Sequence, residues 1–492
     1  MSSIVYSLGA PAYPVLDAYF RCRESVSVII GPLGSGKTYV TAQRVFKQMC
    51  EQAPNAAGIR PSRWMAIRNV YGDLMSTTAR DWQAVLRGPN AADGDMLGTF
   101  RMGGFEPPAH TLDFMLSDGT RVKSEMMFLA LDREDAVRKL RGYQLTGIWL
   151  SETKELHKSV VDMADGRHGR YPSMADGGVM PTWSGMLGDS NAPDDDHWLY
   201  RLAEEEHPKG WAFFKQPGGV VREGDGWRVN PGAENLMHLP RGYYERMVAG
   251  KSRAWVSVNL ANEYGSSFDG KPVHPEYVDD VHCLKELPPP PEPGDSLLLG
   301  FDFGRTPAAA IVHWNGGTGR YTVIDEFVTG DMSAALFAPE LKLYLDRTYP
   351  GCVQRGWGDP AGDHAGQATE DTPLRILRAN GILAFAAPSN EIVLRRAAVS
   401  NPLTRLCMDG RPALLVSPRA KMIRKGLQGG FCYRRIQTTG ERYTDVPDKN
   451  EYSHPVEALE YALMGGGEGR AALRPPKYLQ DQHGDRPALA EM

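Results

Sequence analysis

Short apolar runs alternate with amphipathic stretches over the first third of the chain. The run at residues 26–30 predicts a buried strand, and the pattern at 39–51 predicts the helix that follows the intervening turn. Apolar runs at 64–68 and 147–150 predict two more strands, with a helical pattern at 73–86 between them. Strands that alternate with helices are typical of an α/β domain.

The pattern then becomes irregular and starts again in the second half of the chain. Residues 162–180, rich in Gly, Asp and Met, predict a loop, and residues 243–258 predict a helix. Apolar runs at 297–303, 308–314 and 321–327 are separated by turn-prone Gly, Pro and Asn. These three runs predict an antiparallel meander.

The last part of the chain predicts two more helices and one more strand. A helical pattern at 332–349 leads to a fourth short strand that ends at 357–359, and residues 451–464 predict a final amphipathic helix. The tail from Gly465, with scattered proline and charge, is predicted to be flexible. We find no internal repeat.

A proline run at 287–294 is the clearest candidate for a linker. Proline lacks a backbone donor and favours an extended chain, so the run predicts a boundary between two domains; the alternative is a surface loop inside one domain. At 492 residues the chain is too long for one compact core. We therefore predict a first domain at 1–265, a linker at 266–295, a second domain at 296–466 and a tail at 467–492.

The composition places the chain among ordinary globular proteins. Hydrophobic residues make up 42% and charged residues 23%. No apolar run approaches the ~20 residues needed to cross a bilayer, and no secretory signal opens the chain, so we expect a protein of the cytoplasm without a membrane partner.

Charge and cysteine content narrow the possible partners and cofactors. The formal net charge of −5 offers no general attraction to nucleic acid, so any DNA contact must come from local basic surfaces. Six cysteines lie far apart without metal-ligand spacing, which argues against a zinc site.

Residues 31–38 match the phosphate-binding motif GxxxxGK[ST] at every fixed position. Glycines let such a loop turn its N–H groups toward phosphate, at the positive end of the following helix. Lys37 is expected to reach the β and γ phosphates, and the Thr38 hydroxyl to ligate Mg²⁺. The predicted ATP-binding residues are Gly31, Gly34, Ser35, Gly36, Lys37 and Thr38.

Hydrolysis also needs a carboxylate that orients the attacking water, and Glu152 follows the predicted strand at 147–150. We predict Glu152 as the catalytic base; the alternative is a solvated glutamate at a strand end. Ser151 stands where an aspartate is expected beside the base, and its hydroxyl could hold a metal-bound water without bringing a charge. Residues 188–193 are a weak candidate for sensing the γ-phosphate.

Three acids in the second half predict a metal-dependent site. Asp302 lies in an apolar strand, Asp359 at a strand end and Glu457 on the final helix. Such carboxylates can converge on two divalent ions that activate water and stabilise the leaving oxygen of a phosphodiester. Asp302, Asp359 and Glu457 are thus predicted as both catalytic and metal-binding residues, with His454 and Asp363 as possible assistants.

A structural role without any function is the alternative for each of these acids and for the basic residues between them. Asp302 can pair with Arg305, Asp359 can begin a turn, and Glu457 can be a helix-face charge. Basic residues from 395 to 435, with Phe431 and Tyr433 among them, predict a surface for a DNA backbone or a merely solvated basic helix.

The order of these motifs resembles the large terminase subunit of tailed bacteriophages, over residues 26–464. Beyond the phosphate loop, the resemblance rests on residues 140–142, 301–304, 358–360, 421–435 and 454–459. It implies an ATPase domain of the additional-strand type, followed by a ribonuclease H-like nuclease that cuts concatemeric viral DNA.

The resemblance also implies cofactors, partners and a place of action. ATP and Mg²⁺ would be required, with Mn²⁺ possible at the nuclease. Double-stranded DNA, a portal protein and a small terminase subunit would be partners of a homo-oligomeric ring that can be monomeric in isolation. The protein would act in the host cytoplasm, transiently at the procapsid portal, and be absent from the mature virion.

Two departures from the family pattern, and two rival functions, stay open. Ser151 replaces the usual Asp, and Glu457 replaces the Asp more common at the third nuclease position. One rival function is an ATPase–nuclease of DNA repair, recombination or transposition. The other is a nucleotide-gated DNA-binding scaffold with a degenerate nuclease.

Overall fold

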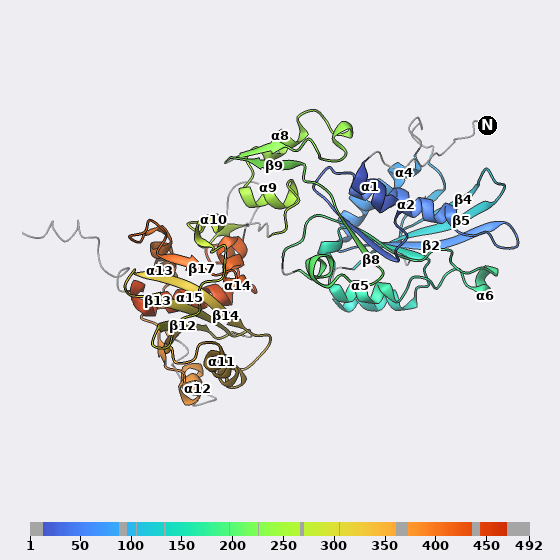
Figure 1. The fold of residues 1–492 in the computed structure, drawn as a ribbon. Coiled ribbons are helices and arrows are strands. Elements are labelled where there is room, and N and C mark those ends of the chain that lie inside the picture. The colour runs from blue at the N-terminus through green and yellow to red at the C-terminus, as the bar shows by residue number, and fades with distance from the viewer. Residues whose placement is uncertain are drawn as a thin grey trace, which may run out of the picture. The chain divides into compact units, whose positions relative to one another are not determined.

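A computed structural model of the chain divides into two compact units, Met1–Ser267 and Phe268–Met492 (Figure 1). It describes residues 13–87, 96–104, 106–131, 134–195, 197–224, 226–265, 270–304, 306–360, 372–434 and 443–469. Within these ranges, none of the helices is long and apolar enough to cross a membrane.

The first unit is built on one eight-stranded sheet in the order β3-β4-β5-β2-β6-β7-β1-β8. The strands from β5 to β8 in this order all pair in parallel, whereas β4 pairs antiparallel with β5 and with β3. The bounds are β1 Val26–Ile30, β2 Ile59–Arg68, β3 Thr99–Arg101, β4 Ala109–Met115, β5 Arg121–Ala130, β6 Gly147–Leu150, β7 Gly185–Ser190 and β8 Trp211–Lys215.

This strand order is that of the additional-strand ATPases. The motif at residues 31–38 follows β1, and Glu152 follows β6. Strand β7 lies between these two strands as the additional strand. Because all three strands are parallel, the residues that follow them meet at one edge of the sheet. The predicted fold class of the first domain is confirmed.

Helices cover both faces of the first sheet, because neighbouring residues of a buried strand point to opposite sides. Trp149 packs with α2 and α4 on one face, and Ile148 packs with η2 and α5 on the other. The bounds are α1 Pro14–Arg21, α2 Lys37–Glu51, α3 Tyr71–Asp73, η1 Leu74–Thr78, α4 Ala79–Leu86, η2 Glu134–Gly142, η3 Thr153–Glu155, α5 Lys158–Asp165, α6 Met174–Gly177, α7 Trp198–Tyr200 and η4 Arg201–Glu206.

The remainder of the first unit departs from the predicted pattern in two places. The predicted helix at 243–258 is two helices, because Gly250 between them has a left-handed φ of 72° that ends the first. The predicted loop at 162–180 contains the end of α5 and all of α6. The other elements are β9 Val220–Glu223, β10 Gly226–Val229, η5 Leu236–His238, α8 Tyr243–Val248 and α9 Arg253–Asn259.

The second unit has a six-stranded mixed sheet in the order β16-β15-β12-β13-β14-β17. Strands β12, β13 and β14 form the predicted antiparallel meander, and β15 and β16 continue the sheet in parallel beside β12. This is the ribonuclease H-like arrangement that was expected, extended by β17. The bounds are β12 Ser296–Asp302, β13 Ala308–Asn315, β14 Arg320–Val328, β15 Val353–Gly358, β16 Ala384–Ala386 and β17 Leu414–Val416.

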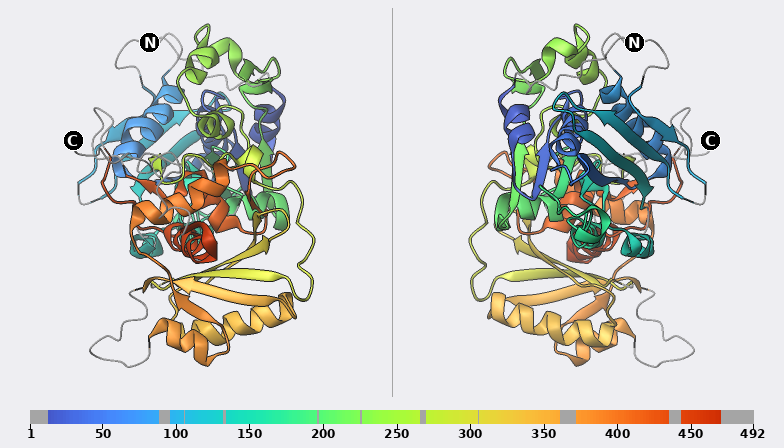
Figure 2. Two further views of the ribbon diagram at one scale, coloured as in Figure 1. Left: turned by 90° about the vertical axis from the view of Figure 1, so that its left-hand side faces the viewer. Right: turned by 90° about the vertical axis from the view of Figure 1, so that its right-hand side faces the viewer.

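Two sets of helices enclose this second sheet. Figure 2 shows the yellow and orange α11 and α12 on one face and the red α15 on the other. Leu299 and Phe301 pack with α11 and α12, whereas Leu298 and Ala310 pack with α13 and α15. The bounds are α11 Ala334–Thr348, α12 Pro373–Ala379, α13 Ile392–Thr404, α14 Lys421–Lys425, η7 Gly426–Gly430, α15 Ser453–Leu463 and η8 Met464–Glu468.

The segment predicted as a linker belongs to the second unit. Strand β11 (Lys271–Pro272) pairs with β18 (Cys432–Tyr433), and α10 (Asp279–His282) is tied to α14 by the ion pair of Asp279 with Arg424. Within the proline run, the N–H of Gly294 donates to the carbonyl of Gly351 (2.9 Å). The run is therefore a surface loop of one unit, which was the alternative interpretation. Of the predicted tail, only residues up to 469 are described.

Candidate nucleotide and metal sites

The loop between β1 and α2 has the backbone that its glycines were expected to permit. Gly34 and Gly36 have φ values of 78° and 83°, a left-handed conformation in which a side chain is strained. A Cβ on Gly34 would also lie 3.0 Å from the ring of Tyr243. Lys37 begins α2 directly after Gly36, so the loop delivers its N–H groups and the helix N-terminus to one place.

Lys37 is held at this loop by a residue from the next strand of the sheet. Its ammonium donates to Oδ1 of Asn191 (2.7 Å) and to the carbonyl of Pro32 (3.4 Å). Asn191 follows the end of β7 directly. The lysine is thus positioned before any phosphate binds, and the weak sequence signal at 188–193 marks its partner.

Thr38 contacts a buried carboxylate on β7. Its hydroxyl donates to Oδ2 of Asp189 (2.9 Å), and the indole N–H of Trp149 donates to Oδ1 of the same group (2.6 Å). Burial, and then the charge of Glu152, raise the pKa of Asp189 to about 6. Hydroxyl and carboxylate oxygens are ligands that Mg²⁺ prefers, so Thr38 and Asp189 fit the magnesium ion that accompanies ATP.

Glu152 lies where the sequence predicted a catalytic base, in a strained backbone conformation. Its φ of 49° is in the left-handed region, which costs a non-glycine residue about 1 kcal/mol or more. Its buried Oε2 has no hydrogen-bond partner among the described residues. A carboxylate oxygen without a donor can accept a proton, as a catalytic base must.

The buried Ser151 is bonded to a residue outside the phosphate loop. Its hydroxyl shares a hydrogen bond with that of Thr78 on η1 (2.8 Å), and the residue is 1% exposed. The role suggested for Ser151, holding a metal-bound water through its hydroxyl, stays a prediction. Arg68 donates a hydrogen bond to the hydroxyl of Thr77, and Arg141 is exposed on η2.

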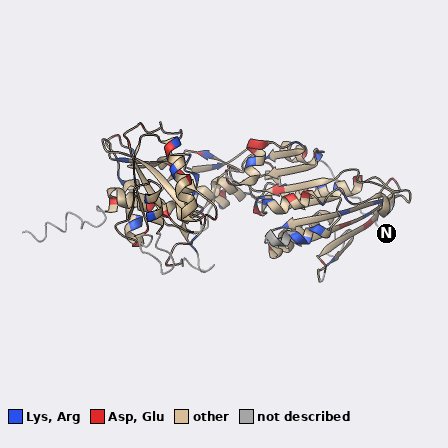
Figure 3. Cartoon of the chain, turned by 90° about the horizontal axis from the view of Figure 1, so that it is seen from below, with Lys and Arg blue, Asp and Glu red and all other residues tan. Residues whose placement is uncertain are grey.

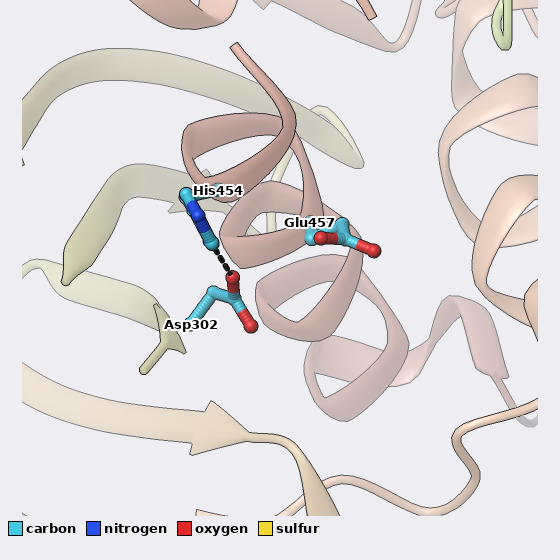
Figure 4. Close-up of side chains that lie close together, drawn as sticks. All are labelled: Asp302, His454 and Glu457. Carbon is cyan, nitrogen blue, oxygen red and sulfur yellow. Dashed lines mark hydrogen bonds and ion pairs between the residues drawn. The ribbon is translucent and has the colours of Figure 1, made fainter. Parts of the chain in front are cut away.

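The second unit brings two of its three predicted acids together with the predicted histidine. Ligand atoms of Asp302, His454 and Glu457 lie within 4.8 Å of one another (Figure 4). Asp302 ends β12, and the other two residues lie one turn apart on α15. Nδ1 of His454 and Oδ2 of Asp302 are 2.5 Å apart. The sequence marked His454 only as a possible assistant, whereas the structure places it within the cluster.

The third acid, Asp359, stands on the adjacent strand. Phe301 of β12 pairs in parallel with Gly358 of β15, so the residues that follow, Asp302 and Asp359, end neighbouring strands. Oδ1 of Asp359 accepts a hydrogen bond from Asn390 (3.0 Å). Asp359 is outside the group formed by Asp302, His454 and Glu457. Asp363 and Arg305 lie outside the described residues.

Glu457 is paired with two cations. Its Oε1 accepts from the buried Arg395 (3.3 Å), and its Oε2 accepts from Lys449, whose side chain is 61% exposed. Burial and the charge of Asp302 raise the pKa of Glu457. The carboxylate oxygens of these acids suit Mg²⁺ or Mn²⁺. A metal ion bound by Glu457 would compete with Lys449 for the Glu457 carboxylate.

Many of the basic residues predicted to line a DNA surface have partners inside the second unit. The pairs are Arg395 with Glu457 and Glu460, Arg405 with Glu468, Arg419 with Asp325, Arg424 with Asp279, and Arg434 with Asp448. Figure 3 shows Lys and Arg interspersed with Asp and Glu in both units. These arginines thus form ion pairs within the second unit. Arg435 lies outside the described residues.

No protein-family model matches the chain, and no curated protein matches it in sequence. Among solved structures it is similar to the large terminase of a thermophilic bacteriophage in complex with ADP, with 13% identity, a TM-score of 0.39 and coverage of 91% of this chain and 96% of that one. It is also similar to the bacteriophage HK97 large terminase (11% identity, TM-score 0.39, 93% and 94% covered). The P22 large terminase nuclease domain matches 41% of this chain and 97% of its own length, at 10% identity and a TM-score of 0.30.

All three are large terminases or a domain of one. At these TM-scores the likeness carries no argument by itself. The function is therefore inferred from the side chains at the two sites and from the sequence motifs.

Proposed function

We propose that this chain is a viral DNA-packaging motor that hydrolyses ATP in its first unit and cuts concatemeric DNA with a two-metal endonuclease in its second. The observation that carries the proposal is the pairing of two sites in one chain. A phosphate loop faces a strand-end glutamate across an additional strand, and a carboxylate cluster lies on a ribonuclease H-like sheet.

The residues of the first site divide the work of ATP hydrolysis. Lys37, held by Asn191, pairs with phosphate oxygens, and the loop N–H groups surround them. Thr38 provides a hydroxyl for Mg²⁺, whose charge would screen the phosphates. Glu152 accepts the proton of the attacking water, because its buried Oε2 is committed to no other donor among the described residues.

The residues of the second site provide carboxylates for divalent ions. Asp302 and Asp359 end adjacent parallel strands, and Glu457 approaches from α15. Metal ions held there would activate water for attack on a phosphodiester. His454 orients the Asp302 carboxylate through the contact between Nδ1 and Oδ2.

The motif resemblance to large terminases supports packaging over the rival functions. In this proposal the chain forms a ring on a portal protein, receives double-stranded DNA from a small terminase subunit, and acts in the host cytoplasm. A repair nuclease would share both sites but would not dock on a portal.

ATP turnover by the full chain tests the motor. Lys37→Ala and Glu152→Ala are each expected to abolish turnover, while Glu152→Ala still binds nucleotide, because the phosphate loop is intact. Normal hydrolysis by Glu152→Ala would mean that another residue is the base.

Packaging itself is tested with procapsids that carry the cognate portal. The proposal expects ATP-dependent protection of double-stranded DNA from added nuclease, lost in Lys37→Ala. Turnover and cleavage without any protected DNA would favour the repair function. Nucleotide binding without turnover or cleavage would favour the scaffold.

A further inference from the structure

Positions 151 and 189 are lateral neighbours at the edge of the first sheet. Leu150 of β6 pairs in parallel with Gly188 of β7, so the next residues, Ser151 directly after β6 and Asp189 near the end of β7, lie side by side. Parallel strands lie about 4.8 Å apart. Strand β7 also pairs with β1, which leads into the phosphate loop, whereas β6 does not. A carboxylate at position 189 is thus one strand closer to the phosphate loop.

The side chain at position 151 is bonded to a residue outside the phosphate loop. The Ser151 hydroxyl is bonded to Thr78, on the segment that follows β2, and β2 borders β6 on the side opposite to β7. A serine here brings no charge to the ATP site.

Asp189 makes the contact that position 151 lacks. Its Oδ2 accepts the Thr38 hydroxyl, and its Oδ1 is fixed by the Trp149 indole. The carboxylate is fully buried, yet these two bonds use only part of its acceptor capacity of about four lone pairs. The end of β7 therefore contacts both loop residues that are predicted to act on ATP. Asp189 contacts Thr38, and Asn191, directly after the strand, contacts Lys37.

We propose that Asp189 on β7, in place of an acid at position 151 on β6, is the carboxylate that acts with Thr38 to hold the Mg²⁺ of bound ATP. The inference rests on the proposed ATP hydrolysis. It assigns the acid that binds magnesium to β7 and the base, Glu152, to the end of β6. Thr153 links the two strands, because its hydroxyl donates to the carbonyls of both Leu150 and Asp189 (2.9 and 3.2 Å).

The test measures how strongly Mg²⁺ tightens nucleotide binding. The full chain is titrated with a fluorescent, non-hydrolysable ATP analogue in excess EDTA and in excess Mg²⁺. We expect Mg²⁺ to tighten binding to the parent chain at least about tenfold, as one charge-assisted contact would. Asp189→Asn keeps the shape of the side chain and is expected to abolish this tightening while binding in EDTA remains. Ser151→Ala is the matched control and is expected to retain it.

A double variant tests whether the two positions are equivalent. Ser151→Asp combined with Asp189→Asn returns the acid to β6 and is expected to regain the Mg²⁺ response. Failure to regain it would overturn the equivalence of positions 151 and 189.

Three further outcomes separate the possible errors. A full Mg²⁺ response in Asp189→Asn would overturn the inference and leave the proposed ATPase standing. Loss of binding in EDTA as well would make Asp189 a structural residue and also overturn the inference. A parent chain that binds no nucleotide would overturn the proposed function.

Discussion

Gly300 is the point where the candidate metal site can be disturbed without touching any of its ligands. It lies in β12 under α15, two residues before Asp302, and a Cβ there would stand 1.7 Å from the carbonyl oxygen of Ala458. Ordinary van der Waals contact begins at 3.4 Å, so Gly300→Ala must move α15 and β12 apart by about 1.7 Å. Ala458 follows Glu457 directly, so the movement separates the two halves of the site.

Two effects are expected in Gly300→Ala. Overpacking of this kind costs about 1 to 3 kcal/mol of stability, which lowers the unfolding midpoint of a unit of this size by about 2 to 4 °C for each kcal/mol. Misplacement of catalytic groups by about 1 Å costs on the order of a hundredfold in rate, so metal-dependent DNA cleavage should fall by at least that factor. ATP turnover should stay within about twofold of the parent, because the first unit has its own core.

Calorimetry and plasmid cleavage with the full chain check both effects. The unfolding transition of the second unit is recognised as the one that nucleotide does not raise. Gly330→Ala is the matched control, because a Cβ at this position meets nothing within 4 Å. Parent-like stability together with parent-like cleavage in Gly300→Ala would refute the close packing of α15 on β12 and with it the assembly of the site.

Two further predictions concern the charges and the backbone at the sites. Lys449→Ala should lower the Mn²⁺ concentration needed for half-saturation about two- to fivefold in calorimetric titration, because an exposed lysine no longer competes at Glu457; a higher requirement would mean that Lys449 supports the metal. The free energy of unfolding of Glu152→Gly should be about 1 kcal/mol higher than that of Glu152→Ala. Both variants lose the carboxylate, but only alanine retains a Cβ at a φ of 49°. Equal denaturation midpoints would show that the strand end relaxes and stores no strain.

The parts of the fold that could be predicted are those encoded locally. Apolar runs and turn-forming glycines, each within a few residues, predict the strand at 26–30, the phosphate loop and the meander from β12 to β14. Glu152 and Asp302 were predicted as site residues for the same reason, because a charged residue in or directly after an apolar strand is visible in the sequence.

The parts that were missed depend on lateral neighbours. The role proposed for Asp189 follows from the pairing of β6 with β7, which no local pattern specifies. The proline run was interpreted as a linker because composition cannot show that β11 returns to pair with β18. Arg405 and Arg424 could not be recognised as structural for the same reason, since their carboxylate partners Glu468 and Asp279 lie far along the chain.

Cleavage of supercoiled plasmid by the full-length Asp302→Ala variant, in Mg²⁺ and in Mn²⁺, tests the central claim most directly. The claim is that one chain carries an ATPase and a separate metal-dependent nuclease. The account predicts that cleavage disappears while ATP turnover stays within about twofold of the parent, since Asp302 belongs to the second unit alone. Continued metal-dependent cutting by Asp302→Ala would contradict the nuclease assignment.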